Sequence, residues 1–207
     1  MIEAPNILGA IIAGGQGTRL GSSNKALQLL AGKPLIHHVH ERLRHQTERV
    51  IVNANRDIEA IKAALPDETP IVSDVPRYAG RGPLAGLHSC LQTADQLGFG
   101  HLLTAPTDTP FFPSDIAMKL AGNPDRAAIR MAAHGGYRHP LFALWPVSLL
   151  SDLTQFLNEA DQNKVTVFAE RHTLIEIDFS SHNDPFFNIN TPADLAKAEA
   201  MIAKPVA

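Results

Sequence analysis

Short apolar runs rich in β-branched residues alternate along the first half of the chain with segments in which apolar residues recur every three or four positions. The runs are typical of buried strands, and they lie at 7–12, 50–52, 71–72 and 101–105. The periodic segments are typical of helices, and their stripes cover 36–43, 58–65 and 84–94. This alternation predicts a mostly parallel sheet with helices on both faces.

The second half of the chain is less regular. We expect strands at 127–131, 142–145 and 174–178, helices at 147–157 and 164–171, and a Gly/His-rich connection at 134–140. A last helix has a clear start, because Thr191 can cap it, Pro192 suits its first turn and Asp194 follows the cap by three residues. Without repeats or linkers, residues 1–207 are predicted to form one α/β domain.

The composition gives expectations about nucleic-acid binding, thiol chemistry and membrane association. The formal net charge is -3 and basic residues do not form consecutive blocks, so we expect no nucleic-acid partner. Cys90 is the only cysteine and falls within a helical pattern, where it is predicted to be an inert core thiol. Neither a signal peptide nor an apolar run of membrane-spanning length is visible, so we expect a cytoplasmic protein without a membrane partner.

The most informative segment directly follows the first strand. Four glycines lie within the eight positions from Gly14 to Gly21, and the cations Arg19 and Lys25 belong to the same loop. Exposed amides beside fixed positive charges suit a polyphosphate. The spacing matches neither a P-loop nor a dinucleotide-binding fingerprint. We therefore expect a nucleotide-handling enzyme in which these two cations stabilise departing pyrophosphate.

A second motif places an acidic residue at the end of a strand. Asp108 follows the run at 101–105 and lies between Pro106 and Pro110, which stiffen the turn. A carboxylate at the sheet edge suits magnesium, which prefers carboxylate and phosphate oxygens. The alternative is that Asp108 only forms a turn or caps a helix.

Three weaker candidates accompany these motifs. Gly82 precedes Pro83 at the start of a helix, whose amino end offers free amides and a positive dipole. Asn53 and Asp74 each end a predicted strand, and such side chains can pair with the edge of a base. A plain helix start and ordinary turns are the alternative interpretations.

Histidines form a further group. His37, His38, His40 and His45 share one helix, which we interpret as a solvated face in preference to a metal site. His139 differs, because it lies in the Gly-rich connection before Pro140 and can face an acceptor.

These motifs together resemble the molybdenum cofactor guanylyltransferases, the MobA-type enzymes. The similarity spans nearly the whole chain, and its motifs are Ala13-Gly14-Gly15 with Arg19 and Lys25, Gly82-Pro83-Leu84-Ala85-Gly86, Asp108-Thr109-Pro110-Phe111, His139-Pro140-Leu141-Phe142 and Asn188-Ile189-Asn190-Thr191-Pro192. Two positions depart from the family pattern. Asn24 stands where an acidic residue is usual, and Leu20 replaces a common methionine.

The resemblance implies a Rossmann-like three-layer domain with the nucleotidyltransferase fold. Residues 1–112 would mainly bind the nucleotide and 113–207 the acceptor. The implied reaction joins GTP to molybdenum-loaded molybdopterin, giving the guanine dinucleotide cofactor and pyrophosphate with Mg²⁺ as cofactor. Transient contacts with molybdenum-insertion proteins and molybdoenzyme chaperones are also implied.

The resemblance, combined with the motifs above, assigns the site residues. The nucleotide-binding set is Ile12, Ala13, Gly14, Gly15, Lys25, Asn53, Asp74, Gly82 and Asp108; Arg19, Lys25 and Asp108 are the catalytic candidates. Asp108 is the metal ligand, and His139, Asn188 and Asn190 are assigned to the acceptor.

Three alternatives remain open at this point. A cytidylyltransferase acting on the same pterin is less favoured, because that group tends to have Ala-Ala-Gly where this chain has Ala13-Gly14-Gly15. A sugar-phosphate or isoprenoid-alcohol-phosphate nucleotidyltransferase fits the first loop only. A non-catalytic nucleotide sensor would not need Arg19, Lys25 and Asp108 together.

Overall fold

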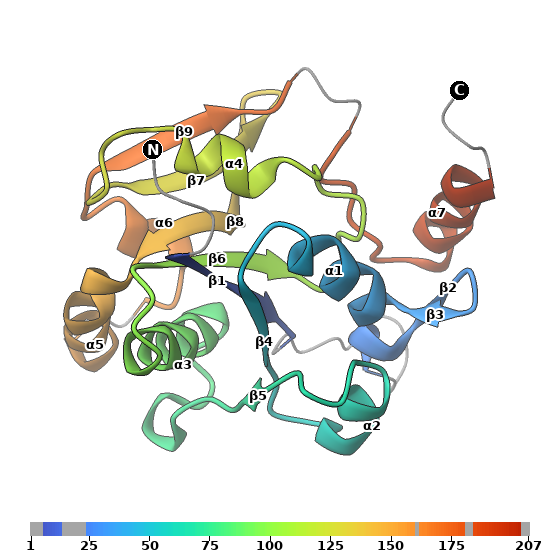
Figure 1. The fold of residues 1–207 in the computed structure, drawn as a ribbon, viewed down its shortest axis with the longest axis horizontal. Coiled ribbons are helices and arrows are strands. Elements are labelled where there is room, and N and C mark those ends of the chain that lie inside the picture. Colours follow the sequence, from blue (N-terminus) through green and yellow to red (C-terminus); the bar gives the residue numbers. More distant parts are fainter. Residues whose placement is uncertain (1–5, 14–23, 160–161, 181–183, 204–207) are drawn as a thin grey trace.

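Seven strands form one sheet in the order β5-β4-β1-β6-β8-β7-β9 within the residues that the computed structural model describes, namely 6–13, 24–159, 162–180 and 184–203 (Figure 1). The strand β8 is antiparallel to its neighbours β6 and β7, and the other neighbouring pairs are parallel. The strands are β1 (Ile7–Ile12), β4 (Arg49–Asn53), β5 (Ile71–Val72), β6 (His101–Pro106), β7 (Ile129–His134), β8 (Tyr137–Pro146) and β9 (Leu174–Asp178).

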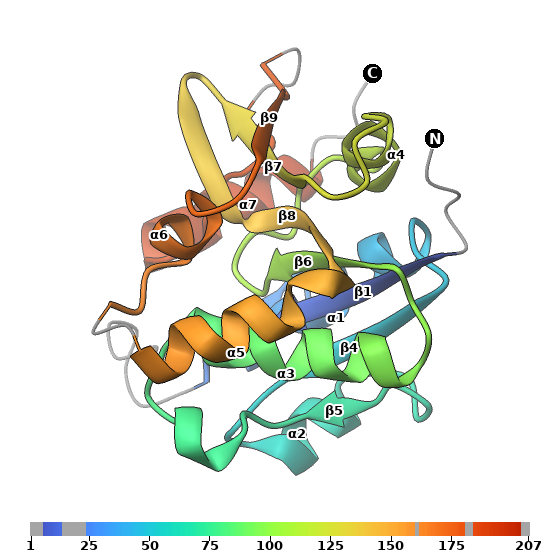
Figure 2. The same cartoon turned by 90° about the vertical axis from the view of Figure 1, so that its left-hand side faces the viewer.

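Helices cover both faces of this sheet. They are α1 (Leu35–Arg44), α2 (Ile58–Ala63), α3 (Pro83–Gln96), α4 (Ile116–Ala121), α5 (Leu150–Glu159), α6 (Val165–Ala169) and α7 (Pro192–Ala203). Short 3-10 turns lie at η2 (Lys25–Leu27), η3 (Pro76–Tyr78) and η4 (Val147–Leu149). Figure 2 shows α3 and α5 side by side on one face.

The strand β1 lies at the centre of both cores, which explains why its sequence is a continuous apolar run. Ile7 and Ile11 pack into the core beneath α1 and α4. Leu8, Ala10 and Ile12 point the other way, into the core beneath α3 and α5. A strand buried on both faces cannot alternate apolar and polar residues, as strands on a half-exposed sheet do.

A small lobe stands beside the main sheet. The hairpin of β2 (Leu29–Leu30) and β3 (Lys33–Pro34) packs against α7, which lies at the periphery of the molecule (Figure 1). Leu30, Ile189 and Ala198 belong to the small core of this lobe. Because Ile189 lies in the segment just before α7, this small core anchors that segment against the hairpin and the start of α1.

The predicted fold class, a mostly parallel sheet in a single α/β domain, is confirmed. The predicted elements are present, with one error at 134–140. Instead of an extended connection, Gly135 and Gly136 alone form the turn, both with positive φ (57° and 80°), and β8 already begins at Tyr137. The hairpin β2–β3 and the short helix α4 were not predicted, and the strands of the hairpin have only two residues each, too few to show a period.

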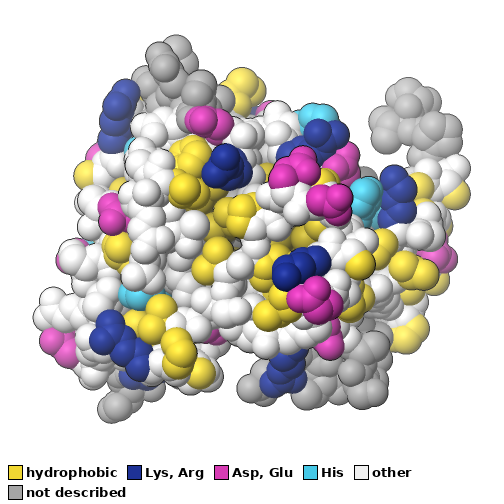
Figure 3. Space-filling model, turned by 60° about the horizontal axis from the view of Figure 1, so that its bottom comes forward, with side chains coloured by type: hydrophobic (Ala, Val, Ile, Leu, Met, Phe, Trp, Pro, Cys, Tyr) yellow, Lys and Arg dark blue, Asp and Glu magenta, His cyan; other side chains and the backbone are white. Residues whose placement is uncertain are grey.

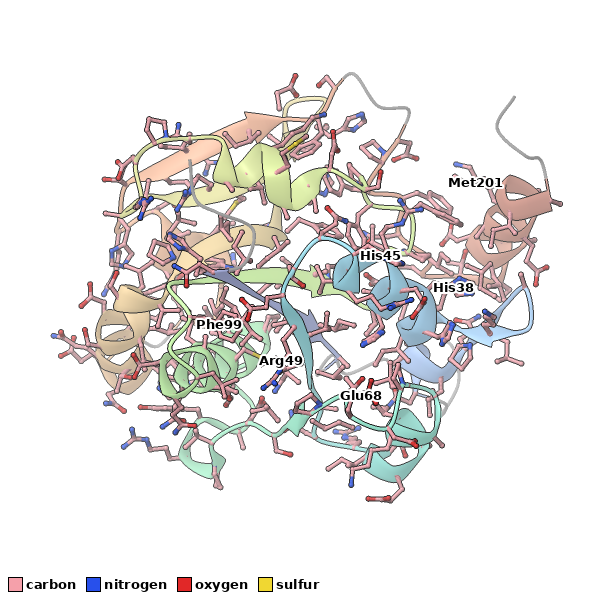
Figure 4. The ribbon with its side chains drawn as sticks, viewed as in Figure 1. His38, His45, Arg49, Glu68, Phe99 and Met201 are labelled. Atoms are coloured by element: carbon pink, nitrogen blue, oxygen red, sulfur yellow. The ribbon has the colours of Figure 1, made fainter. Side chains whose placement is uncertain are left out.

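The predicted solvated face of histidines on α1 is partly wrong. His40 is buried and hydrogen-bonded through Nε2 to the Thr69 hydroxyl at 3.2 Å, and burial lowers its pKa. His38 Nε2 lies 2.8 Å from the carbonyl of Leu30, and Figure 4 shows His38 and His45 at different ends of the helix. Among the described residues, no three His, Cys, Asp or Glu side chains are grouped to hold a metal.

The structure also bears on the predictions made for Cys90 and for membrane-spanning segments. Cys90 is fully buried, and burial raises its thiol pKa, which confirms an inert core thiol. None of the described helices combines the length and apolar character needed to cross a bilayer. Acidic, basic and hydrophobic side chains are interspersed over the face drawn in Figure 3.

Candidate functional site

The connections between strands create a topological switch point at one edge of the sheet. From β1 the chain moves outward to β4 and β5, and then returns to β6 on the other side of β1. In open α/β sheets, ligands bind at such a switch point, beyond the carboxyl ends of the strands. Ile12 pairs with both Asn53 and Pro106, so the segments that follow β1, β4 and β6 begin together.

The two charged residues with the strongest sequence signal meet at this switch point. Lys25 Nζ lies 2.7 Å from Asp108 Oδ2, and their side chains are 18% and 25% exposed. The same ammonium donates a hydrogen bond to Asn190 Oδ1 at 2.5 Å. Residues 83 and 165 positions apart in the sequence therefore share one cation. A half-buried charge with two partners is held in place, yet open to a ligand.

The departure at Asn24 has a local explanation. Asn24 Oδ1 accepts a hydrogen bond from the backbone N–H of Ala26 at 3.1 Å and so caps η2, whose first residue is Lys25. Its Nδ2 donates to Asp57 Oδ2 at 3.0 Å. An aspartate at position 24 would cap equally well but would repel Asp57, since it has no proton to donate when ionised. Asn24 therefore fits this chain's Asp57.

Asp108 is held from the side opposite Lys25. The Thr109 hydroxyl lies 3.1 Å from Asp108 Oδ1 and also contacts Asn188 Oδ1. The backbone N–H of Ile189 donates to the Asp108 carbonyl at 2.8 Å. The segment before α7 therefore closes over the turn that carries Asp108, with Asn188 and Asn190 on either side of this contact.

Helix α1 and the turn just after it anchor the continuation of the Asp108 turn, which the sequence did not predict. Arg42 donates to the carbonyl of Phe112 at 2.9 Å. Gln46 donates to the carbonyl of Pro113 at 3.2 Å and accepts from the N–H of Ala117 at 3.2 Å. Backbone groups are the partners of these side chains, so no motif in the turn itself marks them.

Asn53 and Asp74 form a second polar centre. Asn53 is 1% exposed, and its Nδ2 donates to Asp74 Oδ1 at 2.8 Å and to the Val72 carbonyl at 3.1 Å. Asn55, absent from the predicted set, donates to Asp74 Oδ2 at 2.8 Å and accepts from the Asp74 backbone N–H at 2.8 Å. A carboxylate fixed in this way can accept hydrogen bonds from the ring donors of a base.

Helix α3 fits closely against this centre. A Cβ at Gly86 would lie only 2.3 Å from Asn53 Oδ1, so the helix can approach only because this residue has no side chain. At the start of α3, Gly82 has φ 60° and ψ -147°. Arg81 ties this turn to the second half of the chain, since it donates to the carbonyl of Leu157 at 2.7 Å and to Asn163 Oδ1 at 2.9 Å.

His139 lies on β8 instead of in a loop. It pairs with Ala132 of β7, just beyond a register shift that follows the Met131–Ala143 pair. The ring stacks on Phe186 with 4.2 Å between centroids. Its Nε2 is buried without a hydrogen-bond partner, and burial lowers its pKa. The ring is therefore a polar group on an apolar support, where burial disfavours its charged form.

The structure brings together most of the predicted site residues that it describes. Ala13 joins them through its backbone N–H, which donates to the Asn53 carbonyl at 2.9 Å. Three predicted residues, Gly14, Gly15 and Arg19, lie outside the described residues.

The comparisons with known proteins show that this fold belongs to a nucleotidyltransferase. The chain belongs to the MobA-like NTP transferases, because the model of the MobA-like NTP transferase domain matches residues 9–174. A molybdenum cofactor guanylyltransferase of Rhizobium leguminosarum bv. trifolii (strain WSM2304) is 40% identical, over 96% of this chain and 94% of that relative.

Solved structures agree with this family. A molybdopterin-guanine dinucleotide biosynthesis protein A from Archaeoglobus fulgidus has a TM-score of 0.76 and 27% identity, over 95% of this chain and 98% of that one. The same fold occurs in Rv0371C of Mycobacterium tuberculosis, solved as a complex with manganese, with a TM-score of 0.68 and 15% identity over 94% and 98% of the two chains.

Proposed function

We propose that this protein transfers GMP from GTP to molybdenum-loaded molybdopterin, forming the molybdopterin guanine dinucleotide and releasing pyrophosphate. The Lys25–Asp108 pair beside the Asn53–Asp74 pair supports nucleotidyl transfer, because one pair suits phosphates and the other a base edge. The choice of GTP and of the pterin rests on the relative with 40% identity over 96% of this chain.

The nucleotide lies along the switch point in this proposal. The backbone of Ile12 and Ala13 and the turn at Gly82 approach it most closely, with Gly14 and Gly15 completing the first loop. Asp74, held by Asn53, accepts from the ring donors of guanine. Lys25 and Arg19 neutralise the phosphates, Lys25 as a point charge and Arg19 through a fork of two donors.

Asp108 fits a divalent ion, and Mg²⁺ is the ion we propose. Magnesium in nucleotide sites typically takes one or two carboxylates, with phosphate and water oxygens filling the other positions. A half-buried carboxylate whose Oδ2 is paired with the Lys25 ammonium meets that requirement once Lys25 moves to the phosphates. Bound there, the ion would supply charge neutralisation at the phosphate oxygens.

The acceptor lies on the other side of Asp108. We propose that residues 1–112 mainly bind the nucleotide and residues 113–207 mainly bind the pterin, with His139, Asn188 and Asn190 facing the acceptor. Asn190 bonds Lys25 directly, which supports a position for the acceptor phosphate beside the transferred group. The same assignment implies transient contacts with molybdenum-insertion proteins and molybdoenzyme chaperones.

Bond formation and cleavage occur in line at one phosphorus. An oxygen of the terminal phosphate of the pterin forms a bond with the α-phosphorus of GTP. The bond from that phosphorus to the oxygen that bridges the α- and β-phosphates breaks. The electron pair of this bond leaves with pyrophosphate, whose growing charge Lys25 and Arg19 stabilise. A phosphate is already ionised near neutral pH, so this step needs no strong general base and depends on positioning.

Turnover with two nucleotides tests the proposal. Purified protein is incubated with Mg²⁺, molybdenum-loaded molybdopterin and either GTP or CTP, and the dinucleotide product and pyrophosphate are quantified. We expect product with GTP and a large preference over CTP. Asp108→Asn serves as the matched inactive control, because it keeps the size of the side chain and removes its charge. A preference for CTP, or equal turnover by Asp108→Asn, would contradict the proposal.

A further inference from the structure

The carboxylate of Asp108 has two side-chain partners, Lys25 and Thr109, which differ in their exposure to solvent. Lys25 holds Oδ2 at 2.7 Å from a side chain that is 18% exposed. The Thr109 hydroxyl holds Oδ1 at 3.1 Å from a residue that is 0% exposed. Lys25 is partly exposed and belongs to the face that the proposed function assigns to phosphates, whereas Thr109 is enclosed by protein.

The Thr109 hydroxyl also has a choice of acceptor. It has a single proton, so it donates either to Asp108 Oδ1 or to Asn188 Oδ1 at any moment. A carboxylate is the stronger acceptor of the two, because hydrogen bonds to an ionised group are about twice as strong as neutral ones. When the hydroxyl donates to Asp108, Asn188 Oδ1 loses that proton, so the two oxygens compete for Thr109.

We propose that Thr109 is a positioning residue that keeps the Asp108 carboxylate in its metal-binding orientation when Lys25 leaves it for the nucleotide. This inference rests on the proposed function, in which Asp108 holds a divalent ion and Lys25 neutralises phosphates. In the ligand-free protein both the Lys25 ion pair and the Thr109 hydrogen bond orient the carboxylate, so the loss of one is tolerated. In the nucleotide complex only Thr109 remains on the protein side.

A consequence distinguishes this role from a purely structural one. Removal of the hydroxyl changes metal binding in the nucleotide complex much more than it changes the stability of the free protein, where the Lys25 ion pair persists. Outer-shell partners of metal ligands typically change metal affinity by roughly 10–100-fold when they are replaced. We expect removal of the Thr109 hydroxyl to lower the affinity of the nucleotide complex for Mn²⁺ by a factor in that range.

The experiment compares Thr109→Val, which preserves the shape and removes the hydroxyl, with Thr109→Ser, which retains it. Mn²⁺ affinity is measured by electron paramagnetic resonance in the presence of a non-hydrolysable GTP analogue, and thermal unfolding is measured without ligand. Thr107→Val is the matched control, since Thr107 is a buried threonine of the same turn. We expect weakened Mn²⁺ binding for Thr109→Val alone, rescued in Thr109→Ser.

Two outcomes separate failure of this inference from failure of the proposed function. If Asp108→Asn loses Mn²⁺ but Thr109→Val binds it as tightly as the unchanged protein, Asp108 is the ligand and the role of Thr109 is wrong. If Asp108→Asn itself binds Mn²⁺ with unchanged affinity, the proposed metal site is wrong. Equal weakening in Thr109→Val and Thr107→Val would show a nonspecific disturbance of the turn and would also overturn the inference.

Discussion

Single residues in this protein are constrained by atoms that are distant in sequence. Gly86 illustrates this, because its missing side chain leaves room for Asn53, on a different element. The motif Gly82-Pro83-Leu84-Ala85-Gly86 places Gly86 in a helix, but the group that contacts it could not be read from the sequence. Only the fold shows that the group in contact is the amide that orients Asp74.

Gly86→Ala therefore tests the proposed base-binding role of the Asn53–Asp74 centre. Alanine normally stabilises a helix interior by about 1 kcal/mol relative to glycine. Here the new methyl group would lie 2.3 Å from Asn53 Oδ1, and overpacking costs about 1–3 kcal/mol. We expect a net loss of stability in urea unfolding and a higher KM for GTP.

Gly122→Ala is the matched control for this change. A Cβ at Gly122 would meet the Lys119 carbonyl at 3.4 Å, an ordinary contact, in a backbone with φ -64°. We expect stability equal to or above that of the unchanged protein. A Gly86→Ala protein with unaltered stability and KM would show that Asn53 can move without consequence.

At the scale of elements, α7 and the segment before it contribute to the site although they are far from it in sequence. Thr191 and Asp194 cap α7 reciprocally: the Thr191 N–H donates to Asp194 Oδ2 at 2.8 Å, and the Asp194 N–H donates to Thr191 Oγ1 at 3.1 Å. This confirms the predicted helix start. Asp194 Oδ2 also accepts from the Asn190 N–H at 3.0 Å, so the cap fixes the residue that bonds Lys25.

We expect Thr191→Ala to destabilise the protein by about 1 kcal/mol, the usual cost of losing an N-cap side chain. Because the cap also orders Asn190, we expect a lower kcat/KM as well. Equilibrium unfolding and steady-state turnover measure the two effects. Thr191→Ser retains the hydroxyl and should restore both. A change in stability without any change in kcat/KM would separate α7 from the site.

The predictable part of the fold and site follows from signals of short range. Continuous apolar runs predicted the strands, and the Gly/Lys and Asp/Pro motifs singled out Lys25 and Asp108, which the structure brings together. The roles of Arg42, Gln46 and Asn55 were not predictable, since their partners are backbone groups or a side chain 19 or more residues away. His139 was misplaced in a loop because the two glycines before it suggested a longer connection than the turn at Gly135 and Gly136.

Across the whole molecule, buried histidines link stability to pH. Burial is the largest cause that lowers the pKa of His40, His88, His101 and His139 from the ordinary value of 6.5. The unfolded chain therefore binds protons that the folded protein does not. Their contribution to stability is complete above the unfolded pKa and is lost as pH falls through the folded values.

We expect the free energy of unfolding to decrease as the pH is lowered from about 7.5 to about 5.5, the range in which histidine titrates. Urea unfolding across this range measures the slope. His88→Gln should reduce the slope, because glutamine can keep a hydrogen bond to Thr154 without titrating. His45→Gln, at an exposed position, is the control and should leave it unchanged. Stability that is independent of pH in this range would contradict the argument.

The most direct test of the whole account is a crystal structure of the protein with GTP and Mn²⁺, with the ion located by its anomalous scattering. We predict the ion bonded to Asp108 and to phosphate oxygens, with Lys25 Nζ moved from the carboxylate to the triphosphate and the guanine edge against Asp74. An ion bound away from Asp108, or a triphosphate out of reach of Lys25, would contradict the account.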